Sequence, residues 1–246
     1  MHSAPGQGSR RVPVIKGILF DKDGTLVDFQ ATWFAIGDLM ALQAAGGDRA
    51  NANTLMEAAG YDYEKHCFRA DSVFAAGTNA DIVALWYPDL SPAERQAKVN
   101  FFDTFTAEEG AAQSVALPGS KEAVASLHSR GFRIGLATND STGGAEKTLL
   151  ALGIAQMFDA AYGYDAVANP KPAPDSIYAF SDLTGLKPSE IAMVGDNRHD
   201  LEMAKAGGAL AIGVLSGTGT RESLMPLADV VLNSIADLPA YLTDQV

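Results

Sequence analysis

The sequence predicts an α/β fold: a doubly wound, mostly parallel sheet with an inserted all-helical cap domain. In the second half of the chain, short apolar runs alternate with helical segments, as in parallel sheets that helices cover on both faces. An isolated apolar run at residues 14–20 lacks the polar alternation of a half-exposed strand, so it is assigned to the same sheet. We therefore expect a core made of residues 12–27 and 117–246, a cap at 28–116 and a mobile tail at 1–11.

The insert is expected to be helical because alanine, leucine, methionine and aromatic residues recur in it at helical spacing. Asn51 and the pair Ser91-Pro92 are typical helix starts, whereas Gly46-Gly47, Gly60 and Gly110 are typical stops. The three expected helices are FQATWFAIGDLMALQAAG, NANTLMEAAG and SPAERQAKVNFFDTFTAEEG.

The rest of the core is expected to alternate helix and strand up to the C-terminus, the order that builds a parallel sheet. The expected helices are SKEAVASLHSRG, GAEKTLLALG, APDSIYAFSDLTG, HDLEMAKAGG and IADLPAYLT. The expected strands are FRIGLAT, FDAAYG, EIAMVGD, LAIGVL and DVVLN.

The composition excludes several classes of protein. The formal net charge is −12 and the 18 basic side chains form no cluster, so we expect no nucleic-acid partner. The chain contains no apolar run of about 18 residues and no secretory signal pattern, so we expect no membrane partner. The single cysteine, Cys67, cannot form an internal disulfide, which favours a reducing compartment and makes the cytoplasm the expected location.

Acidic and hydroxyl side chains are concentrated just after three of the expected strands. Ligands of open parallel sheets bind beyond the carboxyl ends of the strands, so these side chains should meet in one crevice. Lys171 lies on the proline-rich segment NPKPAPD, which cannot be helical and should form a stiff loop. The residues after the strands are Asp21, Asp23, Thr138, Asn139, Asp140, Asp196, Asn197 and Asp200.

Each of these features has an ordinary structural explanation when taken alone. DKDGT could be an exposed turn, Thr138 to Asp140 and GDNRHD could be helix caps, and Lys171 could be a solvated lysine. Four ordinary turns would not be expected to place acid, hydroxyl, cation and acid at successive strand ends. The combination instead suits phosphoryl transfer: a carboxylate nucleophile, a second carboxylate as acid and base, and Mg²⁺ to neutralise charge.

The chain resembles the haloacid dehalogenase superfamily of hydrolases, and within it the phosphoglycolate-phosphatase-like members with a helical cap after the first motif. The four motifs that carry this resemblance are FDKDGTLVD, LATND, NPKPAPD and VGDNRHDLEMAKAGG, in this order. The resemblance implies a Rossmann-like core.

The resemblance also implies a role for each residue of the four motifs. Asp21 would attack phosphorus, and Asp23 would protonate the leaving oxygen and then deprotonate water. Thr138, Asn139 and Lys171 would bind the phosphoryl group. The implied Mg²⁺ ligands are Asp21, Asp196 and the backbone carbonyl of Asp23. Asn197 and Asp200 would lie close by, with Asp200 expected to support the ligands rather than to bind the metal itself. Gly24 and Thr25 would shape the turn that lets the cap open and close.

An acid at position 23 favours a phosphate ester as the substrate. True dehalogenases of the superfamily have no acid at this position, because a halide leaving group needs no proton. Ion pumps with the similar stretch DKTGT have threonine there and need membrane helices. Lys22 is unusual at its position, and we expect its side chain to point away from the site.

The cap is expected to supply specificity. Arg69 could bind a carboxylate or a second phosphate of the substrate, but pairing with Asp71 or Glu64 at a helix end explains it equally well. His66 and Cys67 are assigned no role. The other cap candidates are Phe29, Thr32 and Trp33.

These observations together predict a Mg²⁺-dependent phosphatase for a small phosphorylated metabolite, phosphoglycolate-like or a sugar phosphate, that acts through an aspartyl phosphate. A sugar phosphomutase of the same fold would return the phosphoryl group to a sugar, and a catalytically silent binding module would keep only the fold. A monomer or a homodimer is expected.

Overall fold

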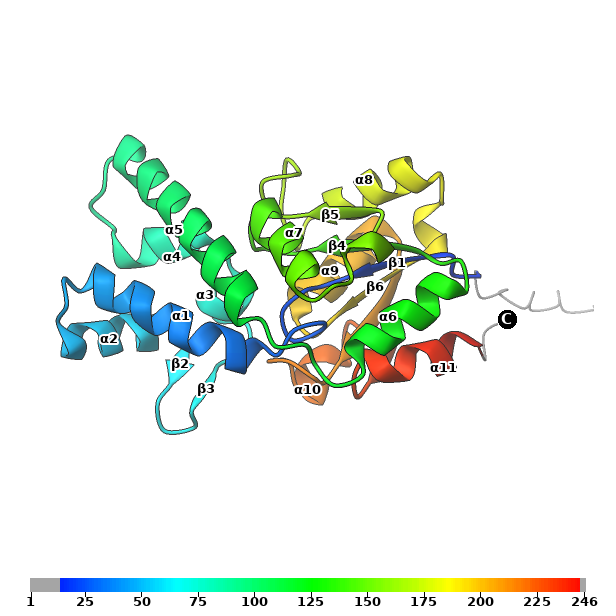
Figure 1. The fold of residues 1–246 in the computed structure, drawn as a ribbon, viewed down its shortest axis with the longest axis horizontal. Coiled ribbons are helices and arrows are strands. Elements are labelled where there is room, and N and C mark those ends of the chain that lie inside the picture. Colours follow the sequence, from blue (N-terminus) through cyan, green and yellow to red (C-terminus); the bar gives the residue numbers. More distant parts are fainter. Residues whose placement is uncertain (1–13, 244–246) are drawn as a thin grey trace, which may run out of the picture.

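The structure is a computed structural model that describes residues 14–243. The tail expected at residues 1–11 lies outside the described residues. The described chain forms two bodies, a larger α/β core and a smaller cap that consists mainly of helices (Figure 1). Among the described residues, no helix combines the length and the apolar character needed to cross a bilayer.

The core is built on a sheet of six strands in the order β5-β4-β1-β6-β7-β8, and each neighbouring pair is parallel. The central strand β1 pairs with β4 and β6, and Phe20 at its end lies opposite Leu136 and Val194. The carboxyl ends of these three strands are therefore level with one another. The strands span Gly17–Phe20 (β1), Arg133–Ala137 (β4), Ala160–Tyr162 (β5), Ile191–Gly195 (β6), Leu210–Val214 (β7) and Val230–Leu232 (β8).

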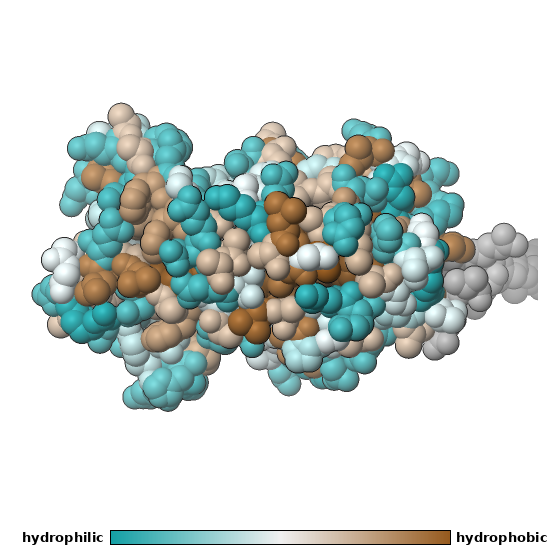
Figure 2. Space-filling view, in the orientation of Figure 1, coloured by the Kyte–Doolittle hydropathy of each residue, from teal (hydrophilic) through white to brown (hydrophobic). Residues whose placement is uncertain are grey.

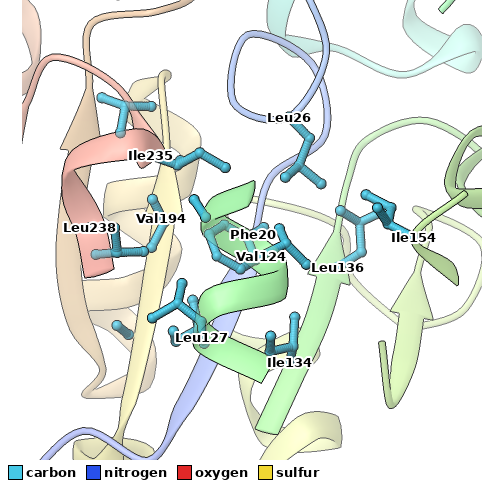
Figure 3. Packing of buried hydrophobic residues seen from close by; sticks show 14 of the residues in the cluster. Phe20, Leu26, Val124, Leu127, Ile134, Leu136, Ile154, Val194, Ile235 and Leu238 are labelled. Carbon is cyan, nitrogen blue, oxygen red and sulfur yellow. The ribbon is translucent and has the colours of Figure 1, made fainter. Parts of the chain in front are cut away.

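Helices cover both faces of the sheet, which confirms the predicted doubly wound fold. Side chains alternate between the faces of a strand, and in β1 Ile18 and Phe20 pack on one side while Leu19 packs on the other. The first side carries Val124 and Leu127 from one helix and Leu238 from another (Figure 3). The helices on this side are α6 (Ser120–Ser129), α7 (Thr142–Ala151) and α11 (Leu238–Thr243), and those on the other are α8 (Asp175–Thr184) and α9 (Arg198–Gly207).

Short helical turns complete the core. The stretch IADLPAYLT, expected as one helix, is divided into a 3₁₀ turn and α11. A short helix after β7, α10 (Arg221–Leu224), does not follow from the sequence pattern. The 3₁₀ turns are η1 (Ala155–Met157), η2 (Pro188–Glu190) and η3 (Ile235–Asp237).

The cap contains five helices and one two-stranded antiparallel ribbon in the described chain, so the all-helical expectation is corrected in this detail. The ribbon forms because the Asp62 carboxylate accepts the backbone N–H groups of Glu64 and Lys65, which closes a turn. The rings of Tyr61 and Phe68 then pair across the strands at 5.0 Å. The elements are α1 (Phe29–Ala44), α2 (Arg49–Ala59), β2 (Tyr61–Asp62), β3 (Cys67–Phe68), α3 (Val73–Ala76), α4 (Asn79–Trp86) and α5 (Pro92–Gln113).

Two helix signals in the cap differ from the expectation. Asp48, not Asn51, caps α2, because its carboxylate accepts the first free backbone N–H groups of that helix. Gly110 does not end α5, which continues to Gln113. A Cβ atom at Gly110 would meet the indole of Trp33 at an ordinary contact distance of 3.7 Å, so Gly110 packs beside that ring within the helix.

The cap has its own apolar core, separate from the two clusters on the sheet faces. Two adjacent segments join it to the sheet domain: the Asp28 N–H donates to Val115 O at 2.8 Å, and the Leu117 N–H donates to Leu26 O at 2.9 Å. On the face drawn in Figure 2, apolar and hydrophilic residues are interspersed over both bodies. The residues at the centre of the cap core include Ile36, Met56, Val83 and Phe102.

The separate cap core leads to a stability prediction. Phe102 is fully buried on α5, whereas the neighbouring Phe101 is 43% exposed on the same helix. Phe102→Ala should lower the free energy of unfolding by about 3–5 kcal/mol, because it leaves a cavity, and Phe101→Ala by about 1 kcal/mol or less. Urea denaturation of the two variants checks this. Equal losses would show that the cap does not pack around Phe102.

Candidate active site

A cavity lies between the carboxyl ends of the central strands and the cap. Because β1, β4 and β6 end level with one another, the polar residues that follow them in the sequence face the same space. The core contributes Asp21, Asp23, Thr138, Asn139, Asp140, Lys171, Asp196, Asn197, His199 and Asp200. The cap contributes Phe29, Trp33, Phe74, Ala75, Ala76, Gly77, Thr78, Asn79 and Ile82.

Three buried carboxylates and one lysine form the centre of the cavity. One oxygen each of Asp21, Asp196 and Asp200 lies within 4.8 Å of the other two. Lys171 Nζ contacts Asp21 Oδ1 and Asp200 Oδ1, both at 2.6 Å. Burial raises the pKa of Asp21 well above its ordinary value, and the Lys171 charge opposes that shift. Although burial alone would lower the pKa of Lys171, Asp200 and Asp21 raise it above its ordinary value, so the lysine is charged.

Asp196 is fixed by the loop after β7. The Thr218 backbone N–H donates to Asp196 Oδ2 at 2.6 Å, and the Thr218 hydroxyl lies 3.2 Å from the same oxygen. Burial, together with the charge of Asp200, raises the pKa of Asp196 to about 7. The sequence analysis missed Thr218, although SGTGT follows an expected strand and the same strand-end rule could have found it.

Two glycines allow the chain to close around the Asp196 carboxylate. A Cβ atom at Gly217 would lie 2.0 Å from Asp196 Oδ2, and one at Gly24 would lie 2.6 Å from it. Gly24 also has a φ of 78°, which L side chains rarely adopt. The turn of DKDGT therefore needs glycine for two reasons, its backbone conformation and its contact with Asp196. Thr25, the next residue, is fully buried, and its hydroxyl has no hydrogen-bond partner among residues 14–243.

The carboxylate cluster suits a divalent cation with a preference for oxygen ligands, such as Mg²⁺. Asp21 and Asp196 each have one oxygen engaged by a protein donor and a second that remains for a metal. Asp200 differs, because Lys171 contacts its Oδ1 and the Asn197 N–H donates to its Oδ2 at 3.0 Å. The donors on Asp200 therefore favour a supporting position beside the metal over direct ligation.

Thr138 and Asn139 also reach the cavity. Thr138 is buried, and its Oγ1 accepts the Asp140 N–H at 3.1 Å. The amide of Asn139 donates to Ala76 O in the cap at 2.8 Å and to Lys171 O at 3.2 Å. The side chain thus links core and cap, and its buried Oδ1 has no partner within the described part of the chain.

Lys22 does not point away from the site, so that expectation is wrong. Its side chain is 1% exposed, and its Nζ lies 2.6 Å from Asp23 Oδ2 and 3.2 Å from Asp140 Oδ2. Strand β1 ends at Phe20, so the regular alternation of side chains no longer applies at position 22. Although burial alone would lower the pKa of Lys22, Asp23 and Asp140 raise it above its ordinary value. Burial raises the pKa of Asp140, and the Lys22 charge opposes that shift.

The structure brings two of the cap candidates to the cavity and leaves two outside it. Phe29 and Trp33 line the cavity, whereas Thr32 and Arg69 are not among the lining residues. Arg69 lines a separate, open depression of the cap, and its guanidinium donates to Glu57 O at 2.6 Å. Arg69 is thus not positioned to meet a substrate in this arrangement of the cap, and its partner is a carbonyl rather than Asp71 or Glu64.

The chain is similar in sequence to known hydrolases. A sequence model of the haloacid dehalogenase-like hydrolases matches residues 15–208. The phosphoglycolate phosphatases of Escherichia coli (strain K12) and Salmonella typhimurium (strain LT2) are each 30% identical over 238 aligned positions, which cover 91% of this chain and 91% of each relative.

Solved structures share the fold. A haloacid dehalogenase-like hydrolase from Bacteroides fragilis superposes with a TM-score of 0.72 at 19% identity, covering 91% of this chain and 99% of that one. A predicted phosphoglycolate phosphatase from Haemophilus somnus has a TM-score of 0.71 at 24% identity, covering 92% and 97%. At these identities the likeness shows the fold alone.

The raised pKa of Asp196 leads to a prediction for protein stripped of divalent cations with a chelator. The unfolded carboxyl releases its proton near its ordinary pKa of 3.8, whereas the folded one keeps it up to about 7. Because the folded state holds the extra proton in this window, its stability should fall as the pH rises. The Tm of the wild type relative to Asp196→Asn should therefore fall by several degrees between about pH 4.5 and pH 8.

Added Mg²⁺ should reverse this trend, raising the wild-type Tm more at about pH 8 than at about pH 5.5, because a metal needs the ionised carboxylate. Thermal melts across this pH range measure both effects. A Tm difference between the wild type and Asp196→Asn that does not change with pH would contradict the raised pKa of Asp196.

Proposed function

The chain belongs to the haloacid dehalogenase-like hydrolases, and on that basis we propose a Mg²⁺-dependent phosphatase that hydrolyses a small phosphate monoester through an aspartyl phosphate. The family and its phosphoglycolate phosphatase relatives already make the chain a hydrolase of the phosphatase class. The observation that supports the finer proposal is the buried Asp21 carboxylate, with Lys171 at 2.6 Å and Asp196 beside it at the end of the central strand.

Asp21 is the proposed nucleophile. One oxygen of its carboxylate attacks phosphorus, and the bond from phosphorus to the leaving oxygen breaks. The Lys171 charge pairs with the carboxylate in the free enzyme and with the phosphoryl oxygens as the bond forms. Asp200 keeps the lysine in place through the contact between its Oδ1 and Lys171 Nζ.

Asp23 is the proposed proton carrier. It lies two residues beyond Asp21 and lines the same cavity. In the first step its carboxyl gives a proton to the leaving oxygen, and in the second the resulting carboxylate takes a proton from the water that attacks the aspartyl phosphate. Phosphate is released and Asp21 is regenerated, so the proton balance closes over the two steps.

The phosphoryl oxygens are bound, in this proposal, by the Thr138 hydroxyl, the Asn139 backbone N–H and Lys171, which all lie at the cavity wall. Asp21, Asp196 and the backbone carbonyl of Asp23 would hold Mg²⁺, which supplies positive charge between the anionic nucleophile and the anionic substrate. Asp200 and Asn197 would support these ligands.

The cap wall limits the choice of substrate. The cap residues that line the cavity in the described chain are uncharged, and several are aromatic. A neutral, hydroxylated leaving group such as a sugar suits this uncharged wall. A leaving group with a carboxylate, as in phosphoglycolate, would need a cation from elsewhere. We therefore place sugar phosphates beside phosphoglycolate as candidates for a small phosphorylated metabolite.

Other properties of the chain stay predictions from the sequence. These are the cytoplasmic location, the monomeric or homodimeric state, and the lack of nucleic-acid and membrane partners.

The nucleophile assignment is tested with Asp21→Asn. With Mg²⁺ and a panel of phosphoglycolate, sugar phosphates, nucleotides and p-nitrophenyl phosphate, the variant should lose at least about a thousandfold in kcat, because an amide oxygen does not replace a carboxylate as nucleophile. Asp182→Asn, an exposed position on α8, serves as the matched control and should retain activity. An Asp21→Asn variant that still turns over would refute the assignment.

The proton-carrier assignment is tested with Asp23→Asn. Alkyl phosphates should lose about a hundredfold to ten-thousandfold in kcat/KM, because an alkoxide leaves poorly without a proton, whereas p-nitrophenyl phosphate should lose much less. With p-nitrophenyl phosphate the variant should release about one equivalent of nitrophenol rapidly and then slow, since the aspartyl phosphate accumulates. Rapid-mixing kinetics measure this burst, and equal losses on both classes of ester would contradict the acid role.

A further inference from the structure

Each oxygen of Asp23 contacts a side chain that the proposed mechanism does not use, one through a hydrogen bond and the other through an ion pair. Trp33 Nε1, on the cap helix α1, donates to Asp23 Oδ1 at 2.5 Å. Lys22 Nζ, on the core, lies 2.6 Å from Asp23 Oδ2. One donor thus comes from each body of the protein, and both reach the same carboxylate.

Lys22 is itself held in place on several sides. Besides Asp23, its Nζ lies 3.2 Å from Asp140 Oδ2 and 4.9 Å from the centre of the Trp33 ring. The other oxygen of Asp140 accepts the Ser141 N–H at 2.7 Å, which fixes that carboxylate. A lysine that is 1% exposed is costly to bury unless it is paired, so this arrangement differs from that of an ordinary surface lysine.

The site therefore contains two lysines, and each bridges two aspartates. Lys171 joins Asp21 to Asp200, and Lys22 joins Asp23 to Asp140. The first pair includes the proposed nucleophile and the second the proposed proton carrier. The carboxylates of Asp21 and Asp23 are thus each paired with a different lysine.

We propose that Trp33 and Lys22 are positioning residues for Asp23, an inference that rests on the proposed phosphatase function. The terminal torsion of an aspartate is broad, so one donor leaves the carboxylate plane poorly defined. Donors on both oxygens fix that plane. Each carboxylate oxygen accepts about two hydrogen bonds, so a lone pair remains free on each to carry the proton to the leaving oxygen. Proton transfer depends steeply on this geometry.

The two tryptophans of the chain provide a matched pair of variants. Both are 7% exposed in the cap core, and each donates its Nε1 hydrogen, Trp33 to Asp23 and Trp86 to Leu55 O at 3.0 Å. Trp33→Phe keeps an aromatic ring beside Lys22 but removes the donor to Asp23. Trp86→Phe removes a buried donor of the same kind, and Trp86 does not line the cavity.

The test compares kcat/KM for an alkyl phosphate and for p-nitrophenyl phosphate, with Mg²⁺ present. Trp33→Phe should lose about 10- to 100-fold on the alkyl ester and less than about threefold on the nitrophenyl ester, because only the poor leaving group needs a well-placed proton. Trp86→Phe should change both values by the same factor. Equal losses on the two esters for Trp33→Phe would overturn the positioning role of Trp33.

Lys22 needs a separate variant, because its removal alone leaves Asp23 and Asp140 without their shared cation. In Lys22→Met/Asp140→Asn one carboxylate is neutralised together with the lysine, which limits the cost to folding. Circular dichroism and a cooperative melt establish that this variant folds. The kcat/KM of this variant should again fall more for the alkyl ester than for the nitrophenyl ester. If the ratio of the two kcat/KM values equals that of the wild type, the role of Lys22 is overturned.

The outcome for the wild type separates this inference from the function on which it rests. A wild type that hydrolyses none of the esters with Mg²⁺ would refute the phosphatase proposal, and the positioning role with it. An active wild type together with a Trp33→Phe variant that behaves like Trp86→Phe would refute the positioning role alone.

Discussion

Aspartates are packed closely together at the carboxyl ends of the central strands, and the neighbouring parts of the structure compensate their charge. Five of them line one cavity: Asp21, Asp23, Asp140, Asp196 and Asp200. Lys171 and Lys22 pair with four of these aspartates. Burial, to which the like charges of neighbouring aspartates add, raises the pKa values of Asp21 and Asp196. The lysine bridges and the backbone donors lower the cost of ionising these carboxylates, and the remaining negative charge makes the site suitable for a divalent cation.

The fold supplies the geometry that this cluster requires. Parallel pairing of β1 with β4 and β6 aligns the strand ends, so residues more than a hundred positions apart in the chain share one cavity. The loop after β7 closes on Asp196 from the other side, and glycines at positions 24 and 217 permit the close contact.

The cap covers the site and also makes polar contacts with the residues that line it. Ala76 O accepts the Asn139 amide and lies 3.2 Å from His199 Nδ1, while Trp33 donates to Asp23, so the cap contacts the polar groups of the core directly. Tyr164 of the core also donates to Asp103 on α5 at 2.5 Å, away from the central carboxylates. Polar contacts thus fix the cap in register with the catalytic side of the sheet, while its own apolar core keeps it folded.

The doubly wound sheet can be predicted from the sequence, because continuous apolar strands alternating with amphipathic helices have few other ways to bury their surfaces. The sequence also indicated which residues gather at the site, since the carboxyl ends of parallel strands share one edge. Three-dimensional packing was needed to place Lys22 beside Asp23, to bring Trp33 to the same carboxylate and to leave Arg69 outside the cavity. The direction of Lys22 depends on a turn, where the alternation of strand side chains has ended. The positions of Trp33 and Arg69 depend on how the cap docks on the core, which no periodicity along the chain encodes.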